Sequence, residues 1–381
     1  MKKPIVGITM GDAAGIGPEV IIKALNTPSI YEECLPVVIG DGKVLLSKVR
    51  SQKSEVRGQK IEDQRPKIEE EDRSQKTEYR LRISDLNIEF QTPSPESRAP
   101  SPEINSIQEI SEAKFEFGTI DCLDLDNINL DDLEIGKISR TTGKAAIEYI
   151  KKAVNLALDN KIQAITTAPI SKESINKAGF HFAGHTDFIA GLTHRRQYAM
   201  MFVSDVLKVV LVTIHIPLHK AVRTISKKKV LTTIRLTHSA LKDYFGIQKP
   251  KIGVAGLNPH AGESGLFGKE EEKEIIPAIE VAQRKGIDAK GPYPPDTIFY
   301  RAVKGEFDVV IAMYHDQGLI PLKLLAFDDA VNVTIGLPII RTSPDHGTAF
   351  DIAGKNIASP KSILEAIKLA AKMSKIKGGK Q

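Results

Sequence analysis

The stretch that decides the fold is Phe307-Asp-Val-Val-Ile-Ala-Met-Tyr-His-Asp-Gln-Gly318. Its first half, residues 307–313, is an apolar run that predicts a buried strand. The run stops at a cluster of polar side chains, Tyr314 to Gln317, and Lys323 follows further along. Open α/β sheets place their ligands at the carboxyl ends of such strands. We therefore predict a functional site centred on this strand end.

Strand and helix patterns alternate along the rest of the chain. Each predicted strand is a short apolar run bounded by glycine, proline or polar residues, and each predicted helix has one apolar face. Such alternation is typical of an α/β protein with a largely parallel sheet. The predicted strands are 4–10, 36–40, 164–168, 207–214, 251–257, 307–313 and 330–335, and the predicted helices begin at 18, 143, 270 and 359.

Composition limits the class of protein. A chain of 381 residues can bury one large or two medium cores. Its net charge of +5 is too small to indicate a nucleic-acid partner. Cys34 and Cys122 are distant and form no metal or redox motif, so we expect a reducing, cytoplasmic setting. No apolar run approaches the ~20 residues that span a bilayer, so we expect no membrane partner.

Residues 51–112 differ in composition from their surroundings. Acidic and basic residues alternate there, a Lys-x-Glu unit recurs from Lys53 to Glu78, and a proline-rich tract fills 92–102. A mixed-charge repeat with little to bury is typical of a solvated segment. We predict a largely disordered insertion or a loosely held helix, because apolar residues are too few for a coiled coil. The catalytic unit would then be residues 1–50 and 113–381, with two interleaved subdomains.

A glycine-rich loop, Gly11-Asp-Ala-Ala-Gly-Ile-Gly17, connects the first strand to a helix that begins at Pro18. Such a loop can aim backbone N–H groups at an anion. The spacing is neither a P-loop nor the dinucleotide motif, and a tight turn that needs glycine explains it equally well. Both interpretations stay open at the level of sequence.

Three predicted strands end close to a histidine: His215, His260 and His315. Three neutral imidazoles leave an open coordination position, as in catalytic zinc and related divalent-metal sites. One such histidine would more often be structural, but three favour a metal. Zinc or cobalt suits the histidines, and magnesium or manganese would suit a site that also presents substrate oxygens. We expect His194, His219 and His238 to be surface residues.

Groups that bind anions lie near other strand ends. Lys323, Asn332 and Arg341 could hold a phosphate or carboxylate, although surface solvation or ion pairing would also explain them. Asp296 lies in a proline-framed turn and could act as a general base.

Several long motifs occur along the chain in this order: Gly11-Asp with Gly15-Ile-Gly-Pro-Glu19, Gly184-His-Thr-Asp187, Asn258-Pro-His-Ala-Gly-Glu263, Pro295-Asp-Thr297, Tyr314-His-Asp-Gln-Gly318 and Arg341-Thr-Ser-Pro-Asp-His-Gly-Thr-Ala349. Together they carry a resemblance to a known family. The chain resembles the 4-hydroxythreonine-4-phosphate dehydrogenase family of the vitamin B6 pathway over about 1–45 and 113–375. The resemblance implies an isocitrate/isopropylmalate dehydrogenase-like fold, with two α/β domains that share a mostly parallel sheet and an active site in the cleft between them. It also implies a homodimer.

The resemblance also implies roles for individual residues. It makes His215, His260 and His315 the metal ligands, one of them supplied across the dimer interface. The implied substrate-binding residues are His185, Thr186, Lys323, Asn332 and Arg341, and the implied NAD(P)-binding loop is Asp345, His346, Gly347, Thr348 and Ala349. Asp296 and Lys323 are the catalytic candidates, with Asp296 as the base. Ala13 departs from the family pattern, which has proline there.

The implied reaction is the oxidation of 4-phosphohydroxy-L-threonine at C3 by NAD or NADP, with decarboxylation to 3-amino-2-oxopropyl phosphate. A dehydrogenase of a four-carbon sugar-acid phosphate, such as threonate 4-phosphate, is the alternative within the family. A phosphate acyltransferase of the same fold would need neither the three histidines nor the cofactor loop. A non-catalytic scaffold is supported only by the repeat in 51–112.

Overall fold

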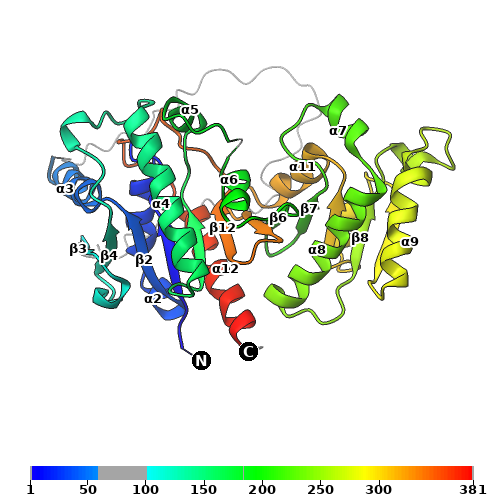
Figure 1. The fold of residues 1–381 in the computed structure, drawn as a ribbon, viewed down its shortest axis with the longest axis horizontal. Coiled ribbons are helices and arrows are strands. Elements are labelled where there is room, and N and C mark those ends of the chain that lie inside the picture. The colour runs from blue at the N-terminus through cyan, green and yellow to red at the C-terminus, as the bar shows by residue number, and fades with distance from the viewer. Residues whose placement is uncertain (1, 59–100, 183, 380–381) are drawn as a thin grey trace, which may run out of the picture.

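The computed structural model describes residues 2–58, 101–182 and 184–379. In this part of the chain, twelve strands form one continuous sheet in the order β3-β4-β2-β1-β5-β12-β11-β6-β7-β10-β8-β9. The sheet runs through two lobes, which lie at the two sides of Figure 1 with α12 between them. The sharing of one sheet by two lobes agrees with the predicted architecture.

The strands of the first lobe are parallel to one another. Those of the second lobe, β7, β10, β8 and β9, are parallel as well. Only β11 and β6, which join the lobes, pair in antiparallel fashion. The predicted largely parallel α/β sheet is therefore confirmed. The strands are β1 Ile5–Thr9, β2 Leu35–Gly40, β3 Glu103–Ile107, β4 Thr119–Asp124, β5 Ala164–Thr167, β6 Ala199–Val203, β7 Lys208–Leu211, β8 Ile252–Ala255, β9 Ala289–Tyr293, β10 Val309–Ala312, β11 Val331–Ile335 and β12 Ile340–Pro344.

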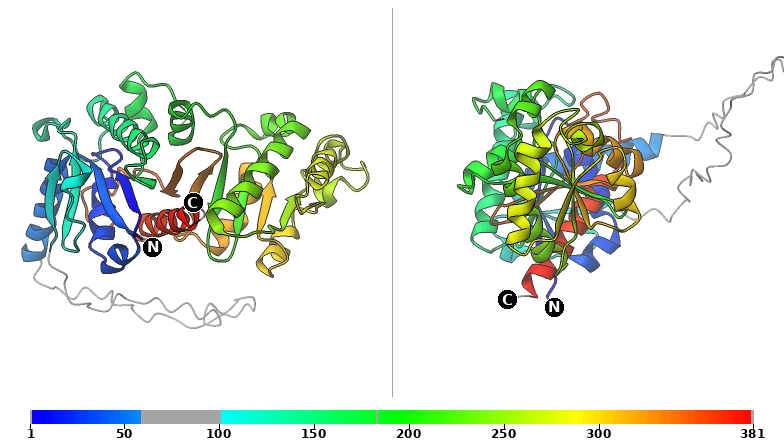
Figure 2. Two further views of the ribbon diagram at one scale, coloured as in Figure 1. Left: turned by 60° about the horizontal axis from the view of Figure 1, so that its bottom comes forward. Right: turned by 90° about the vertical axis from the view of Figure 1, so that its right-hand side faces the viewer.

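Helices cover both faces of the sheet, as Figure 2 shows end-on. Their ends follow local rules of sequence. Ser139 caps α4 by accepting from the Thr141 N–H, and Gly246 ends α8 in the left-handed conformation. The helices are α1 Gly17–Leu25, α2 Pro28–Glu33, α3 Gly42–Gly58, α4 Arg140–Leu158, α5 Lys172–Lys177, α6 His185–Leu192, α7 Leu218–Thr224, α8 Lys227–Phe245, α9 Ile276–Arg284, α10 Ile298–Val303, α11 His315–Leu325 and α12 Lys361–Gly378. Within these residues, no helix is both long and apolar enough to cross a membrane.

One predicted boundary is wrong. We assigned all of 51–112 to an insertion, but α3 continues through 51–58 and Glu103–Ile107 forms the edge strand β3. Ile107 is buried there, so this segment contributes to the core of the first lobe. The composition misled us because an edge strand needs only a few apolar residues. The remainder of the predicted insertion, 59–100, lies outside the described residues.

Candidate functional site

Parallel pairing of β7, β10 and β8 determines where the three histidines lie. Ala312 on β10 pairs with Leu211 on β7, and Ile311 pairs with Val254 on β8, so the three strands end at the same edge. The chain leaves this edge towards the three histidines: His215 after β7, His260 after β8, and His315 as the first residue of α11. The edge is where an open α/β sheet is expected to bind a ligand.

Two of the three histidines meet in one chain. The ring centroids of His215 and His315 are 5.7 Å apart. Partial burial, and then the charges of Lys172 and His315, lower the pKa of His215, which favours its neutral, metal-binding form. Asp316 Oδ1 lies 2.7 Å from Nδ1 of His315. Histidine ligands to metals commonly bond a carboxylate in this way and keep the other nitrogen for the ion.

The third histidine does not join them. The ring of His260 lies against Phe267, with 6.1 Å between centroids. Among the described residues, no group of three or more histidine, cysteine or acidic side chains is arranged to hold a metal ion. The predicted three-histidine site is thus only partly assembled within one chain.

The loop that carries His260 has a defined support. Glu271 is 2% exposed, and its Oε1 accepts the N–H groups of Leu257 and Asn258 at 2.8 and 2.7 Å. Its Oε2 accepts from Asn258 Nδ2 at 2.9 Å. One buried carboxylate therefore fixes the start of the loop, whereas His260 itself is exposed.

A buried cation lies where the two lobes join. Arg341 on β12 is 2% exposed. It donates to Thr167 Oγ1 from Nε at 3.2 Å and Nη2 at 2.8 Å, and to Thr334 Oγ1 from Nη1 at 3.1 Å. Burial lowers the pKa of Arg341 to about 9. Both acceptors are neutral, although buried charges are normally paired with an opposite charge.

Polar groups without partners surround this cation. His185 begins α6, and its buried Nε2 has no hydrogen-bond partner among the described residues. Burial first, and then the charge of Arg341, hold the pKa of His185 well below its ordinary value, so its ring is neutral. Thr186 Oγ1 is 3.5 Å from Thr334 Oγ1. Two residues before Thr334 on β11, the buried Oδ1 of Asn332 also has no partner among the described residues. These predicted substrate-binding residues therefore form one polar region.

Lys323 connects the two lobes. Its Nζ lies 3.1 Å from Oδ2 of Asp345, which follows β12. Lys323 belongs to α11, which also begins at His315, and the charge of Asp345 acts on His215. The histidine pair and the loop after β12 are therefore close in space. Lys323 already has a carboxylate partner, and in this respect it differs from Arg341.

The predicted cofactor loop, 345–349, packs on the glycine-rich loop. Thr348 O accepts from Ile16 N at 3.0 Å, and a Cβ on Gly15 would come within 2.9 Å of Thr348 O. The amides of Asp12 and Gly15 also bond to protein carbonyls. Gly11–Gly17 is therefore a buried turn that needs glycine, and not an open anion cradle. Next to it, His346 and Gly347 line a small cavity of about 100 Å³ together with His185.

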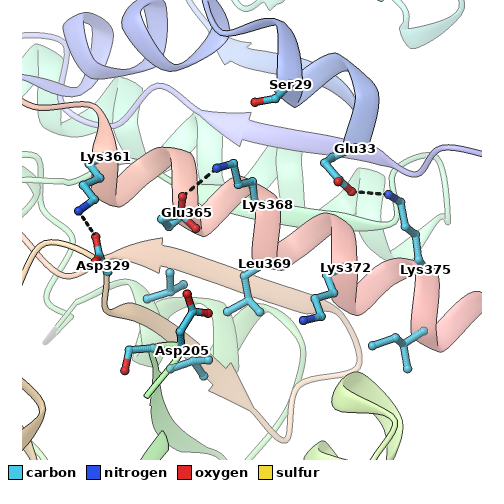
Figure 3. Close-up of a pocket in the computed structure, with 14 residues that line it drawn as sticks. Ser29, Glu33, Asp205, Asp329, Lys361, Glu365, Lys368, Leu369, Lys372 and Lys375 are labelled. Carbon is cyan, nitrogen blue, oxygen red and sulfur yellow. Dashed lines mark hydrogen bonds and ion pairs between the residues drawn. The ribbon is translucent and has the colours of Figure 1, made fainter. Parts of the chain in front are cut away.

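Asp296 and a groove along α12 are two further polar features of the structure. Asp296, the predicted base, is exposed in the turn before α10. A groove along α12 is lined by lysines, three of which are paired: Lys361 with Asp329, Lys368 with Glu365, and Lys375 with Glu33, as Figure 3 shows. No residue that we assigned to the site lines this groove, so it is not the candidate site.

Comparison with known proteins identifies the family of this chain. Residues 32–370 match the family model described as "Pyridoxal phosphate biosynthetic protein PdxA". The chain belongs to this family. A D-threonate 4-phosphate dehydrogenase from Cupriavidus necator is 46% identical over 97% of each chain, and a 4-hydroxythreonine-4-phosphate dehydrogenase from Desulforapulum autotrophicum is 44% identical over 99% of this chain and 97% of its own.

A solved structure is similar as well. The crystal structure of a 4-hydroxythreonine-4-phosphate dehydrogenase from Burkholderia phymatum matches with a TM-score of 0.76 and 44% identity, over 98% of this chain and 99% of its own. The predicted family resemblance is therefore confirmed, and the dehydrogenase names of these PdxA relatives support an oxidoreductase.

Sequence reasoning missed several residues of the site. Thr167 and Thr334 hold Arg341, and Glu271 supports the His260 loop. Only their positions in the sequence could have indicated these threonines. Thr167 ends a predicted strand, and Thr334 lies near Arg341 in the chain. Threonine is common in strands, so the residue type by itself carried no information.

Removal of the Glu271 carboxylate tests how the His260 loop is held. In Glu271→Ala, two partly buried backbone N–H groups lose their acceptor, so we expect the free energy of unfolding to fall by about 3 kcal/mol. Chemical denaturation measures this change, and amide hydrogen exchange should rise most in 257–268. Glu272→Ala removes an exposed neighbour and should change stability by less than ~0.5 kcal/mol. Equal effects of the two substitutions would contradict this account of the loop.

Proposed function

We propose that this PdxA-family protein oxidises 4-phosphohydroxy-L-threonine at C3 with NAD or NADP and decarboxylates the product to 3-amino-2-oxopropyl phosphate, in vitamin B6 biosynthesis. In this reaction the C3 hydroxyl loses its proton to a base, and the hydrogen on C3 leaves as a hydride to the nicotinamide. The resulting β-keto acid then loses CO₂. Relatives named for hydroxythreonine phosphate and for D-threonate phosphate are almost equally similar to this chain. D-threonate 4-phosphate is therefore the second candidate substrate.

The observation that carries the proposal is the unneutralised cation, Arg341, between two lobes. A small phosphorylated acid supplies the negative charge that Arg341 lacks among the residues that the structure describes. His185, Thr186 and Asn332 offer neutral groups for its remaining oxygens. Lys323 would meet the other end of such a ligand, because it lies towards the histidine pair.

A divalent metal suits the donor atoms of His215 and His315. Both rings are close together, His215 favours the neutral form, and Asp316 orients His315. When bound, such an ion polarises an oxygen that it contacts and stabilises negative charge there. Zinc, cobalt, magnesium and manganese remain the candidates. His260 would complete the ligand set.

The loop 345–349 is our candidate for binding NAD or NADP. The buried Nε2 of His346 has no partner among the described residues and is available to a ligand. The dehydrogenase names of relatives support a nicotinamide cofactor in general. We keep Asp296 as the candidate base and Lys323 as the second catalytic residue.

A homodimer would bring the third histidine to the site. The outer face of α11 exposes apolar side chains at helical spacing: Ile320 is 67% exposed, Leu324 85% and Phe327, just beyond the helix, 73%. Leu266, next to the Phe267 that contacts His260, is 73% exposed. In a two-fold symmetric contact, the 266–267 segment of one copy would cover α11 of the other. Because α11 begins at His315, the same contact would carry His260 towards the histidine pair of the other copy.

Turnover measurements test the activity. We expect the purified chain to reduce NAD or NADP with one or both phosphorylated acids, to lose activity when the metal is chelated, and to regain it with zinc, cobalt, magnesium or manganese. His315→Ala should lower turnover on the order of 100-fold or more, because it removes a metal ligand. His219→Ala, an exposed histidine on α7, is the control and should stay near the wild type.

Two results would decide against this assignment. Turnover of D-threonate 4-phosphate alone would replace the hydroxythreonine substrate with the second candidate. Acyl transfer that survives chelation and needs no nicotinamide would reject the dehydrogenase reaction altogether.

A charge on α11 tests the proposed dimer. Leu324→Lys is tolerated by a monomer, because Leu324 is exposed, but it would place a charge in the apolar contact. We expect its mass in solution to shift from dimer to monomer, as measured by size exclusion with light scattering. Leu158→Lys, at the exposed end of α4, is the control and should remain dimeric. If both variants stay dimeric, α11 is not the contact surface.

A further inference from the structure

Arg341 forms hydrogen bonds that are uncommon for a buried guanidinium. Among its hydrogen bonds within the described residues, all three run to threonine hydroxyls, two to Thr167 and one to Thr334. A guanidinium has five N–H groups, so two remain for a ligand. A carboxylate in place of the threonines would neutralise the cation. Hydroxyl groups hold the guanidinium in place and leave its charge available.

The sheet itself places both threonines. Val333 on β11 pairs with Thr342 on β12 in antiparallel register, so the next residue along β11, Thr334, lies across from Arg341. Arg341 also pairs with Ile165 on β5 in parallel register, which puts Thr167 two residues further along the same face. The two acceptors thus approach the guanidinium from neighbouring strands on either side of β12.

The neighbouring groups complete a pocket for an anion. Thr334 Oγ1 is also 3.5 Å from Thr186 Oγ1, at the start of α6. Thr167 and His185 line the same small cavity. The buried Nε2 of His185 has no partner there among the described residues. The two threonines therefore connect the cation with the surfaces that a ligand would touch.

We propose that Thr167 and Thr334 are positioning residues, which hold Arg341 oriented and fully charged for the phosphate group of the substrate. The identity of that substrate rests on the function proposed above. The threonines act through Arg341 and need not touch the ligand themselves.

Phosphate binding provides the test. Thr334→Val and Thr167→Val keep the shape of the side chain and remove the acceptor, so each should weaken the binding of inorganic phosphate about 10-fold or more, as expected when a hydrogen bond to a charged group is lost. Thr334→Ser and Thr167→Ser keep the hydroxyl and should stay within about 3-fold of the wild type. Isothermal titration calorimetry on the full chain measures the affinities without any turnover.

A matched control and a double variant separate positioning from general stability. Thr166→Val removes a buried hydroxyl that forms a hydrogen bond with Thr342 Oγ1 at 2.9 Å. Thr166 precedes Thr167 on the same strand, so its side chain faces the other side of the sheet. The substitution should leave phosphate binding unchanged. In an Arg341→Met background, Thr334→Val should cause no further loss, because Arg341 is the group through which Thr334 acts.

Several outcomes would overturn the proposal. The folded valine variants could bind phosphate with wild-type affinity, or the serine variants could fail to restore binding. Thr166→Val could lose as much phosphate affinity as the other valine variants, or the losses of affinity in the double variant could be additive. If Thr167→Val does not fold, the comparison of Thr334→Val with Thr334→Ser tests the proposal by itself. Absence of phosphate binding by the wild type would also reject it. Absence of turnover with normal phosphate binding would reject only the reaction proposed above.

If the protein turns over a phosphorylated acid, the valine variants should raise KM by the same factor and change kcat by less than about 3-fold.

Discussion

The parallel register of β7, β10 and β8 is the constraint on which the site depends. It ends three strands at one edge, and the chain leaves that edge at each of the three histidines. The pattern of buried apolar side chains along the strands sets this register, so it does not depend on any one polar side chain at a strand end. His215 and His315 follow β7 and β10, which pair directly, and their rings meet. His260 follows β8, and its loop keeps it apart.

The antiparallel strands β11 and β6 supply the second half of the site. They join two parallel lobes into one sheet and place Arg341 at their junction. Neutral hydroxyls bind the guanidinium of Arg341, whereas Lys323 of one lobe forms an ion pair with Asp345 of the other. One cation therefore keeps its full charge for a ligand, and the other is already balanced. This difference gives the site two distinguishable ends, which an elongated substrate with two different anionic groups would need.

The sequence predicted the parts of this structure that follow from local pattern. The apolar run 307–313 contains β10, and alternation of strands and helices predicted a mostly parallel sheet. The edge strand β3 was missed because its few apolar residues follow a charged segment. Contacts between distant segments could not be predicted either. Thr167 reaches Arg341, and Lys323 reaches Asp345, only through tertiary packing.

The central claim is that His215 and His315 of one chain share a metal site with His260 of a second chain. Co-expression of a His215→Ala chain with a differently tagged His260→Ala chain tests it most directly. Mixed dimers would then contain one intact site of two, so a random mixture should regain about a quarter of wild-type activity. His215→Ala mixed with His315→Ala should stay inactive. Activity in the second mixture, or none in the first, would contradict this account.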